Sequence, residues 1–178
     1  MTIRDFDGRQ PSIADNAWVD ESAQVIGDVS LGADVSVWTT TVLRGDVQRI
    51  TVGARTNIQD GTVVHVTSPS PANPAGFPTR IGAGVTIGHR AIVHACTVGD
   101  YCLIGMGAII MDGAVLGDRC ILGAGALVAN GKQLEGGYLY VGSPAKRLRE
   151  LSEEELAFLE HSADHYVALK NRHAGETG

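Results

Sequence analysis

Aliphatic residues recur at every sixth position along most of this chain. One unbroken run comprises Ile13, Val19, Val25, Leu31, Val37 and Leu43. The register resumes at Val52 and, after an interruption, continues from Ile81 to Val128 with one slip of a single residue. Four positions after each aliphatic residue the side chain is again small or β-branched. Since a six-residue unit cannot bury its own apolar side, the pattern predicts short strands stacked as the coils of a parallel β-helix.

The repeats predict an all-β fold within a single domain spanning residues 1–178. The coils are expected over residues 11–130, with a loop at 66–80, because this segment holds four of the six prolines. Residues 131–151 lose the repeat and are expected to form a connector.

A C-terminal helix is expected over residues 152–172. Ser152 and Glu155 have the spacing of a capping box at its start. Leu156, Leu159, Ala163 and Val167 form an apolar stripe, so the helix is expected to pack along the prism of coils.

Composition and charge narrow the possible partners. The chain is 44% hydrophobic but 5% aromatic, with 23 glycines, which favours an aliphatic core on a turn-rich backbone. A net charge of -6 without any basic run argues against nucleic acid and anionic membranes as partners. The sequence shows neither a signal peptide nor an apolar stretch of about 18 residues, and three cysteines cannot all pair, so we expect a cytoplasmic protein with free thiols.

Three histidines occupy related positions on the repeats. His65 and His94 each directly follow an inward residue, and three coil sides separate them, so they should stack one coil apart. A spacing of about 4.8 Å suits two imidazoles that bind one metal. His89 lies on the preceding side of the prism and should point to a different face. The geometry therefore predicts a homotrimer, with a metal at each interface bound by His65 and His94 of one chain and His89 of its neighbour.

A metal held by three histidines has a fourth position for water, whose pKa falls to about 7. This is the arrangement of a catalytic zinc site and provides hydroxide at neutral pH. Zn²⁺ is the expected cofactor, although Fe²⁺ and Co²⁺ also suit three imidazoles.

The histidine spacing H-x23-H-x4-H on hexapeptide repeats resembles that of the gamma-class carbonic anhydrases, and the resemblance covers nearly the whole chain. It implies that the coils are left-handed and that the protein hydrates CO2 to bicarbonate.

The resemblance also implies roles for five further residues. Arg44 and Asp46 in "LRGD" match the arginine and aspartate that pair across the subunit interface of the family. Gln59 in "NIQDG" matches the glutamine that hydrogen-bonds the zinc-bound solvent, and Asp60 matches its acidic neighbour. Tyr166 resembles the tyrosine that many members place over the site.

The chain departs from the archetypal enzymes at two places linked to proton transfer. Val47 replaces the glutamate that follows the interface aspartate, and residues 66–78 contain no acid, as in the shorter subclass without an acidic loop. Two alternatives stay open: an acyl-CoA thioester hydrolase or acyltransferase on the same scaffold, and a non-catalytic trimeric assembly protein.

Overall fold

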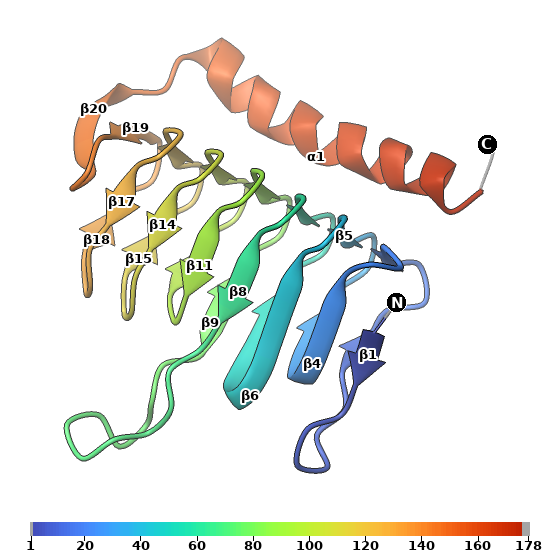
Figure 1. The fold of residues 1–178 in the computed structure, drawn as a ribbon. Helices are drawn as coiled ribbons and strands as arrows, with labels where there is room; N and C mark the ends of the chain where they lie inside the picture. Colours follow the sequence, from blue (N-terminus) through green and yellow to red (C-terminus); the bar gives the residue numbers. More distant parts are fainter. Residues whose placement is uncertain (1, 176–178) are drawn as a thin grey trace.

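The computed structural model describes residues 2–175, which form a left-handed parallel β-helix followed by one helix (Figure 1). The predicted fold class is confirmed. The strands, in chain order, are β1 (Thr2–Arg4), β2 (Ser12–Ile13), β3 (Trp18–Val19), β4 (Gln24–Leu31), β5 (Ser36–Val37), β6 (Val42–Val52), β7 (Asn57–Ile58), β8 (Val63–His65), β9 (Thr79–Ile81), β10 (Thr86–Ile87), β11 (Ile92–His94), β12 (Thr97–Val98), β13 (Leu103–Ile104), β14 (Ile109–Ile110), β15 (Val115–Leu116), β16 (Ile121–Leu122), β17 (Leu127–Val128), β18 (Gln133–Leu134), β19 (Tyr138–Val141) and β20 (Lys146–Glu150).

Each coil has three sides, so a strand pairs with the strand three elements further along the chain. One face contains β7, β10, β13 and β16, the second contains β8, β11, β14 and β17, and the third contains β9, β12, β15 and β18. Backbone amides join successive coils; the Leu103 N–H, for instance, donates to the Cys120 carbonyl at 2.9 Å. Inward side chains stack in columns, and Ile87 and Ile104 are register partners without exposed surface. Burial of such columns supplies the main stabilising contribution of the fold.

Glycine follows the inward aliphatic residue at several corners because successive coils approach closely there. A Cβ atom on Gly53 would lie 2.5 Å from the Gly82 carbonyl carbon, and one on Gly105 would lie 2.5 Å from the Ala124 nitrogen. Only glycine fits these positions without moving the neighbouring backbone.

The stack is longer than the predicted range of 11–130. At one end β1 pairs with β4, and at the other β18 and β19 extend the ladder through the expected connector 131–151. Leu134 and Tyr140 keep the step of six beyond Val128, although the glycine-rich signature has faded. β20 then pairs antiparallel with β19 and ends the sheet. The projecting loop lies between β8 and β9, so it ends at residue 78 rather than at 80.

The helix α1 (Glu153–His173) runs back along the face that contains β10 and β13 (Figure 1). The side chains of Leu159 and Ala163, which belong to this helix, are buried. Two polar contacts fix its position: the Ser162 hydroxyl lies 2.7 Å from that of Thr86, and the buried Lys170 ammonium lies 3.0 Å from Asp34. No helix within residues 2–175 combines the length and the apolar character needed to cross a membrane.

The capping box at the start of α1 is present. The Ser152 hydroxyl accepts from the Glu155 N–H at 3.2 Å, and the Glu155 carboxylate accepts from the Ser152 N–H at 2.9 Å. Arg149 also donates two hydrogen bonds to this carboxylate. The hydrogen bond from Arg149 and that from the Ser152 backbone lower the pKa of Glu155 to about 2, from an ordinary 4.5.

We predict that Glu155→Gln lowers the melting temperature near neutral pH, whereas Glu154→Gln, in the same helical turn, changes it little. Because the folded chain lowers the pKa of Glu155, its stabilisation is complete above pH 4.5 and is lost as the pH falls toward 2. Thermal unfolding of both variants and the wild type between pH 3 and pH 7 tests this. An equal deficit of the Glu155 variant at pH 3 and pH 7 would contradict the assignment.

Candidate metal centre

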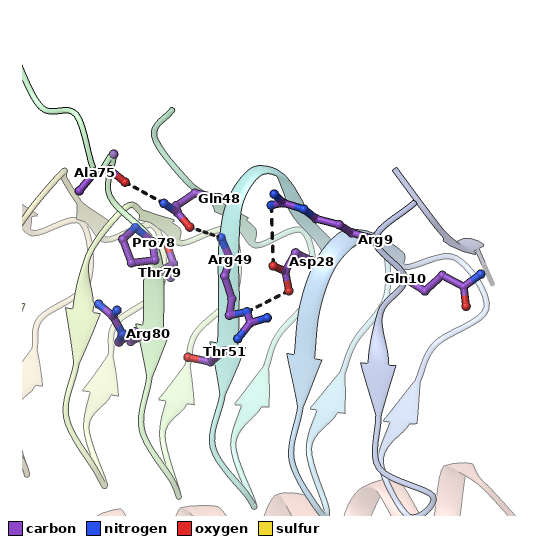
Figure 2. A pocket seen from close by; sticks show the side chains of 11 residues that line it. Arg9, Gln10, Asp28, Gln48, Arg49, Thr51, Ala75, Pro78, Thr79 and Arg80 are labelled. Carbon is purple, nitrogen blue, oxygen red and sulfur yellow. Dashed lines mark hydrogen bonds and ion pairs between the residues drawn. The ribbon is translucent and has the colours of Figure 1, made fainter. Parts of the chain in front are cut away.

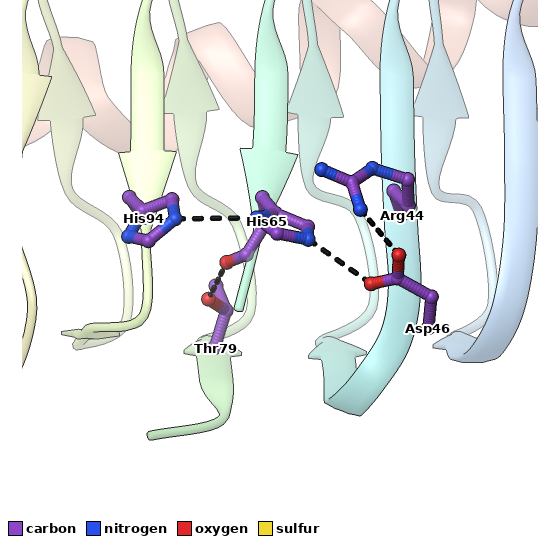
Figure 3. Close-up of polar contacts among 5 residues, drawn as sticks. All are labelled: Arg44, Asp46, His65, Thr79 and His94. Carbon is purple, nitrogen blue, oxygen red and sulfur yellow. Dashed lines mark hydrogen bonds and ion pairs between the residues drawn. The ribbon is translucent and has the colours of Figure 1, made fainter. Parts of the chain in front are cut away.

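His65 and His94 are stacked on adjacent coils, at the ends of β8 and β11 (Figure 3). Their Cα atoms are register partners, and Nδ1 of His65 lies 3.2 Å from Nε2 of His94. Both side chains are partly buried, with 17% and 30% of their surfaces exposed. The predicted stacking is therefore confirmed, and two ring nitrogens point at each other.

Each of these imidazoles also contacts a carboxylate through its other nitrogen. Asp46 lies 3.0 Å from Nε2 of His65, and Asp112 lies 2.7 Å from Nδ1 of His94. Burial raises the pKa of both carboxyl groups, but hydrogen bonds outweigh it and lower the pKa overall. His65 and Arg44 donate to Asp46, while the Thr67 hydroxyl and His94 donate to Asp112. Both carboxylates are therefore ionised acceptors.

The hydrogen bonds determine which nitrogens are protonated. A neutral imidazole has one N–H, and each ring uses it toward its carboxylate. If both rings are neutral, the two remaining nitrogens, 3.2 Å apart, present lone pairs to each other, and a cation between them would stabilise this arrangement. Burial lowers the pKa of His65, which favours its neutral form. Two nitrogens bound tetrahedrally at 2.0–2.1 Å from one metal would be separated by about 3.3 Å, so the pair fits a metal ion.

His89 lies at a corner on another face of the prism and contacts neither of these histidines. Its Nδ1 atom is 2.7 Å from Asp60, and the side chain is 47% exposed. It lines a groove of about 420 Å³ beneath α1, together with Gln59 and Tyr166. Within residues 2–175, no three His, Cys, Asp or Glu side chains of one chain are grouped to hold a metal.

The side chain of Gln59 is oriented by a series of hydrogen bonds between buried side chains. Its Nε2 atom donates to Asn57 Oδ1 at 3.1 Å, and Asn57 Nδ2 donates to the Thr86 hydroxyl at 2.9 Å. That hydroxyl contacts Ser162 of α1, so the helix position and the amide orientation are connected. Since Nε2 is engaged by Asn57 between the coils and α1, Oε1 of Gln59 is left as the acceptor at the groove.

Tyr166 closes the same groove from α1. Its ring packs against Trp38, with the centroids 5.7 Å apart. Burial raises the pKa of the Tyr166 phenol, and the Asp60 carboxylate raises it further. The phenol therefore keeps its proton at neutral pH and can donate a hydrogen bond.

The residues singled out in the sequence thus form two separate groups, each a half-site of the predicted intersubunit centre. His65, His94, Asp46 and Arg44 form one, and His89, Asp60, Gln59 and Tyr166 form the other. Arg44 pairs with Asp46 of its own chain, whereas the family resemblance implies a pair across the subunit boundary.

Sequence reasoning missed Asp112. The repeat slips by one residue at this coil, since Val93 pairs with Ile110, so Asp112 lies one position past the register partner of His94 and coil counting did not identify it. Cys96, close to His94, is no candidate ligand: burial and the Asp112 charge raise its pKa to about 12, so the thiol stays protonated. All three cysteines are free and buried.

Comparisons with known proteins identify the repeat and its relatives. Residues 95–130 match the family model for bacterial transferase hexapeptides (six repeats), and residues 78–110 match that for the hexapeptide repeat of succinyl-transferase. Protein YrdA of Escherichia coli is 50% identical over 96% of this chain and 93% of its own length. A carbonic anhydrase of Geobacillus kaustophilus is 42% identical, covering 93% and 87%. The mitochondrial gamma carbonic anhydrase 2 of Arabidopsis thaliana is 41% identical, covering 98% and 63%.

A solved structure from Bacillus cereus, described as a putative acetyltransferase, superposes with a TM-score of 0.91 at 36% identity. The superposition covers 99% of this chain and 98% of that one. The same prism and terminal helix therefore occur in a chain described as a transferase.

We predict that Asp112→Asn weakens metal binding by about 10–100-fold, because the amide no longer fixes the ring orientation and tautomer of His94. Competition titration of Zn²⁺ against a chromophoric chelator measures the change. Asp164→Asn, which removes an exposed carboxylate on α1, is the matched control. Equal affinity of the Asp112 variant and the wild type would show that Asp112 does not support the ligand.

Proposed function

The chain belongs to the gamma-class carbonic anhydrase family, and on this premise we propose that it hydrates CO2 to bicarbonate at a metal centre shared between subunits of a homotrimer. His65 and His94 of one chain and His89 of the next would hold the metal. The observation that carries this proposal is the pair of ring nitrogens 3.2 Å apart, on two imidazoles whose other nitrogens each contact a carboxylate.

A bound divalent cation, Zn²⁺ or alternatively Fe²⁺ or Co²⁺, would act as a Lewis acid that makes hydroxide available near neutral pH. The carboxylates accept the N–H of the ring nitrogen opposite the metal position and so fix the tautomer and orientation of each ring. Asp46 contacts His65, Asp112 contacts His94, and Asp60 contacts His89.

The remaining residues act on solvent and substrate. Oε1 of Gln59 accepts a hydrogen bond from the attacking solvent and so directs its lone pair toward carbon. Tyr166 covers the groove and offers a phenolic donor to an oxygen of CO2 or bicarbonate. Arg44 keeps Asp46 ionised and adds positive charge where bicarbonate leaves.

The groove beneath α1 favours a second candidate function, the hydrolysis of an acyl thioester. Beyond His89 and Gln59 it is lined by Leu103, Ile121 and Phe158, and its volume of about 420 Å³ exceeds what CO2 requires. An apolar acyl group would bury surface against these side chains. The same cation and the same Gln59 would serve attack on a thioester carbonyl.

We predict that protein prepared without oxygen and loaded with Zn²⁺, Co²⁺ or Fe²⁺ accelerates CO2 hydration in stopped-flow experiments. His94→Ala and treatment with a chelator should both abolish the acceleration. Because Val47 and residues 66–78 supply no carboxylate for proton transfer, the rate should rise with the concentration of imidazole buffer.

A sample that retains metal yet hydrates no CO2 would reject this function. Hydrolysis of acyl-CoA by that same sample would then identify the second candidate. Inactivity in both assays would leave the role of a trimeric assembly protein.

A mixing experiment tests whether His89 reaches the metal from a neighbouring chain. His89→Ala and His94→Ala chains should each be inactive alone. Co-refolded in equal amounts, they should recover about a quarter of the wild-type activity, since random assortment leaves about one interface in four with a full ligand set. Mixtures as inactive as the separate variants would place all three ligands in one chain.

A further inference from the structure

A second cleft, beside the returning end of the projecting loop, is lined by three arginines (Figure 2). Its volume is about 810 Å³. Arg9 comes from the turn before β2, Arg49 from β6 and Arg80 from β9. Asp28 is the one acidic residue among the lining residues. A chain of net charge -6 therefore concentrates positive charge at this place.

The arginines are not balanced by the protein itself. Asp28 lies 3.0 Å from Nε of Arg49 and 3.8 Å from Nη1 of Arg9. Arg80 has no ion-pair partner within the described part of the chain. One carboxylate against three guanidinium groups leaves two positive charges in the cleft. Their mutual repulsion favours a bound anion.

Hydrogen bonds between the Gln48 side chain and the backbone hold one wall of the cleft. Gln48 donates from Nε2 to the Ala75 carbonyl at 2.8 Å and accepts from the Arg49 N–H at 3.0 Å. These bonds hold the returning loop against β6. Thr51 and Arg80 are register partners on neighbouring strands, and both line the cleft.

We propose that this cleft binds a small phosphate-bearing anion, either inorganic phosphate or a phosphate monoester. Guanidinium groups match the geometry of phosphate oxygens with two parallel donors each. A phosphate monoester carries a charge of about -1.5 to -2 at neutral pH, which balances the two unpaired positive charges. Since none of the lining residues is aromatic, recognition rests on the phosphate rather than on a stacked base. The site uses none of the residues of the metal centre, so the two proposals stand independently.

Calorimetric titration of the full-length protein with inorganic phosphate, and separately with glycerol 3-phosphate, tests the proposal at constant ionic strength. We expect saturable binding with a dissociation constant below about 1 mM. Arg80→Gln should weaken it about tenfold, and the Arg49→Gln/Arg80→Gln double variant more strongly. Arg80→Lys, which retains the charge but loses the paired donors, should fall in between.

Arg172→Gln removes the same charge from the last turn of α1 and should bind phosphate like the wild type. The proposal fails if neither phosphate binds the wild type at 10 mM, or if the double variant binds as tightly. Vesicles of phosphatidylcholine with phosphatidic acid distinguish a lipid headgroup from a soluble ligand. Binding to the vesicles without binding of either soluble phosphate would also overturn the proposal.

Discussion

The hydrogen-bonded ladder between successive coils is the constraint on which the rest of this structure depends. It fixes the rise of the chain to one strand spacing per coil, so residues one coil apart must lie side by side. Inward positions then become continuous aliphatic columns, and outward polar residues become rows. The candidate metal centre is built on one such row, in which His65 and His94 are register neighbours. Asp46 and Asp112 contact these rings from the coils on either side, although neither is in exact register with them.

Much of this arrangement could be predicted because the repeat converts sequence distance into spatial distance. The step of six identified the columns, and counting coil sides placed His94 above His65 without any structure. The rule does not give Asp112 in the same way, because the repeat slips by one residue there and Asp112 lies one position past the register partner of His94. The end of the stack was also missed. Leu134 and Tyr140 keep the period of six. Lys132 and Gln133 make the outer surface of that coil polar, so the sequence favoured a connector there.

Other features were not predictable from periodicity, since they depend on how the chain turns corners. β4 and β6 follow the prism around a corner as continuous strands, which joins two faces into one sheet. The three extra residues between Leu43 and Val52, compared with the step of six, are absorbed there as a register shift. This bend carries Arg44 and Asp46 toward the histidines and Arg49 toward the other flank. A pattern of inward residues does not contain that information, because every residue involved points outward.

The division of the site into two half-sites links assembly to metal binding under the proposed function. One chain would provide a pair of imidazoles with ring nitrogens 3.2 Å apart, and the neighbouring chain would provide a single exposed imidazole. Neither half forms a complete ligand set, so a metal that bridges them stabilises the assembled state over the separate chains. The carboxylates are essential to this linkage. Under this proposal, Asp46, Asp60 and Asp112 would hold the N–H of each ring away from the metal position before the subunits meet, so assembly would require no rearrangement of protons.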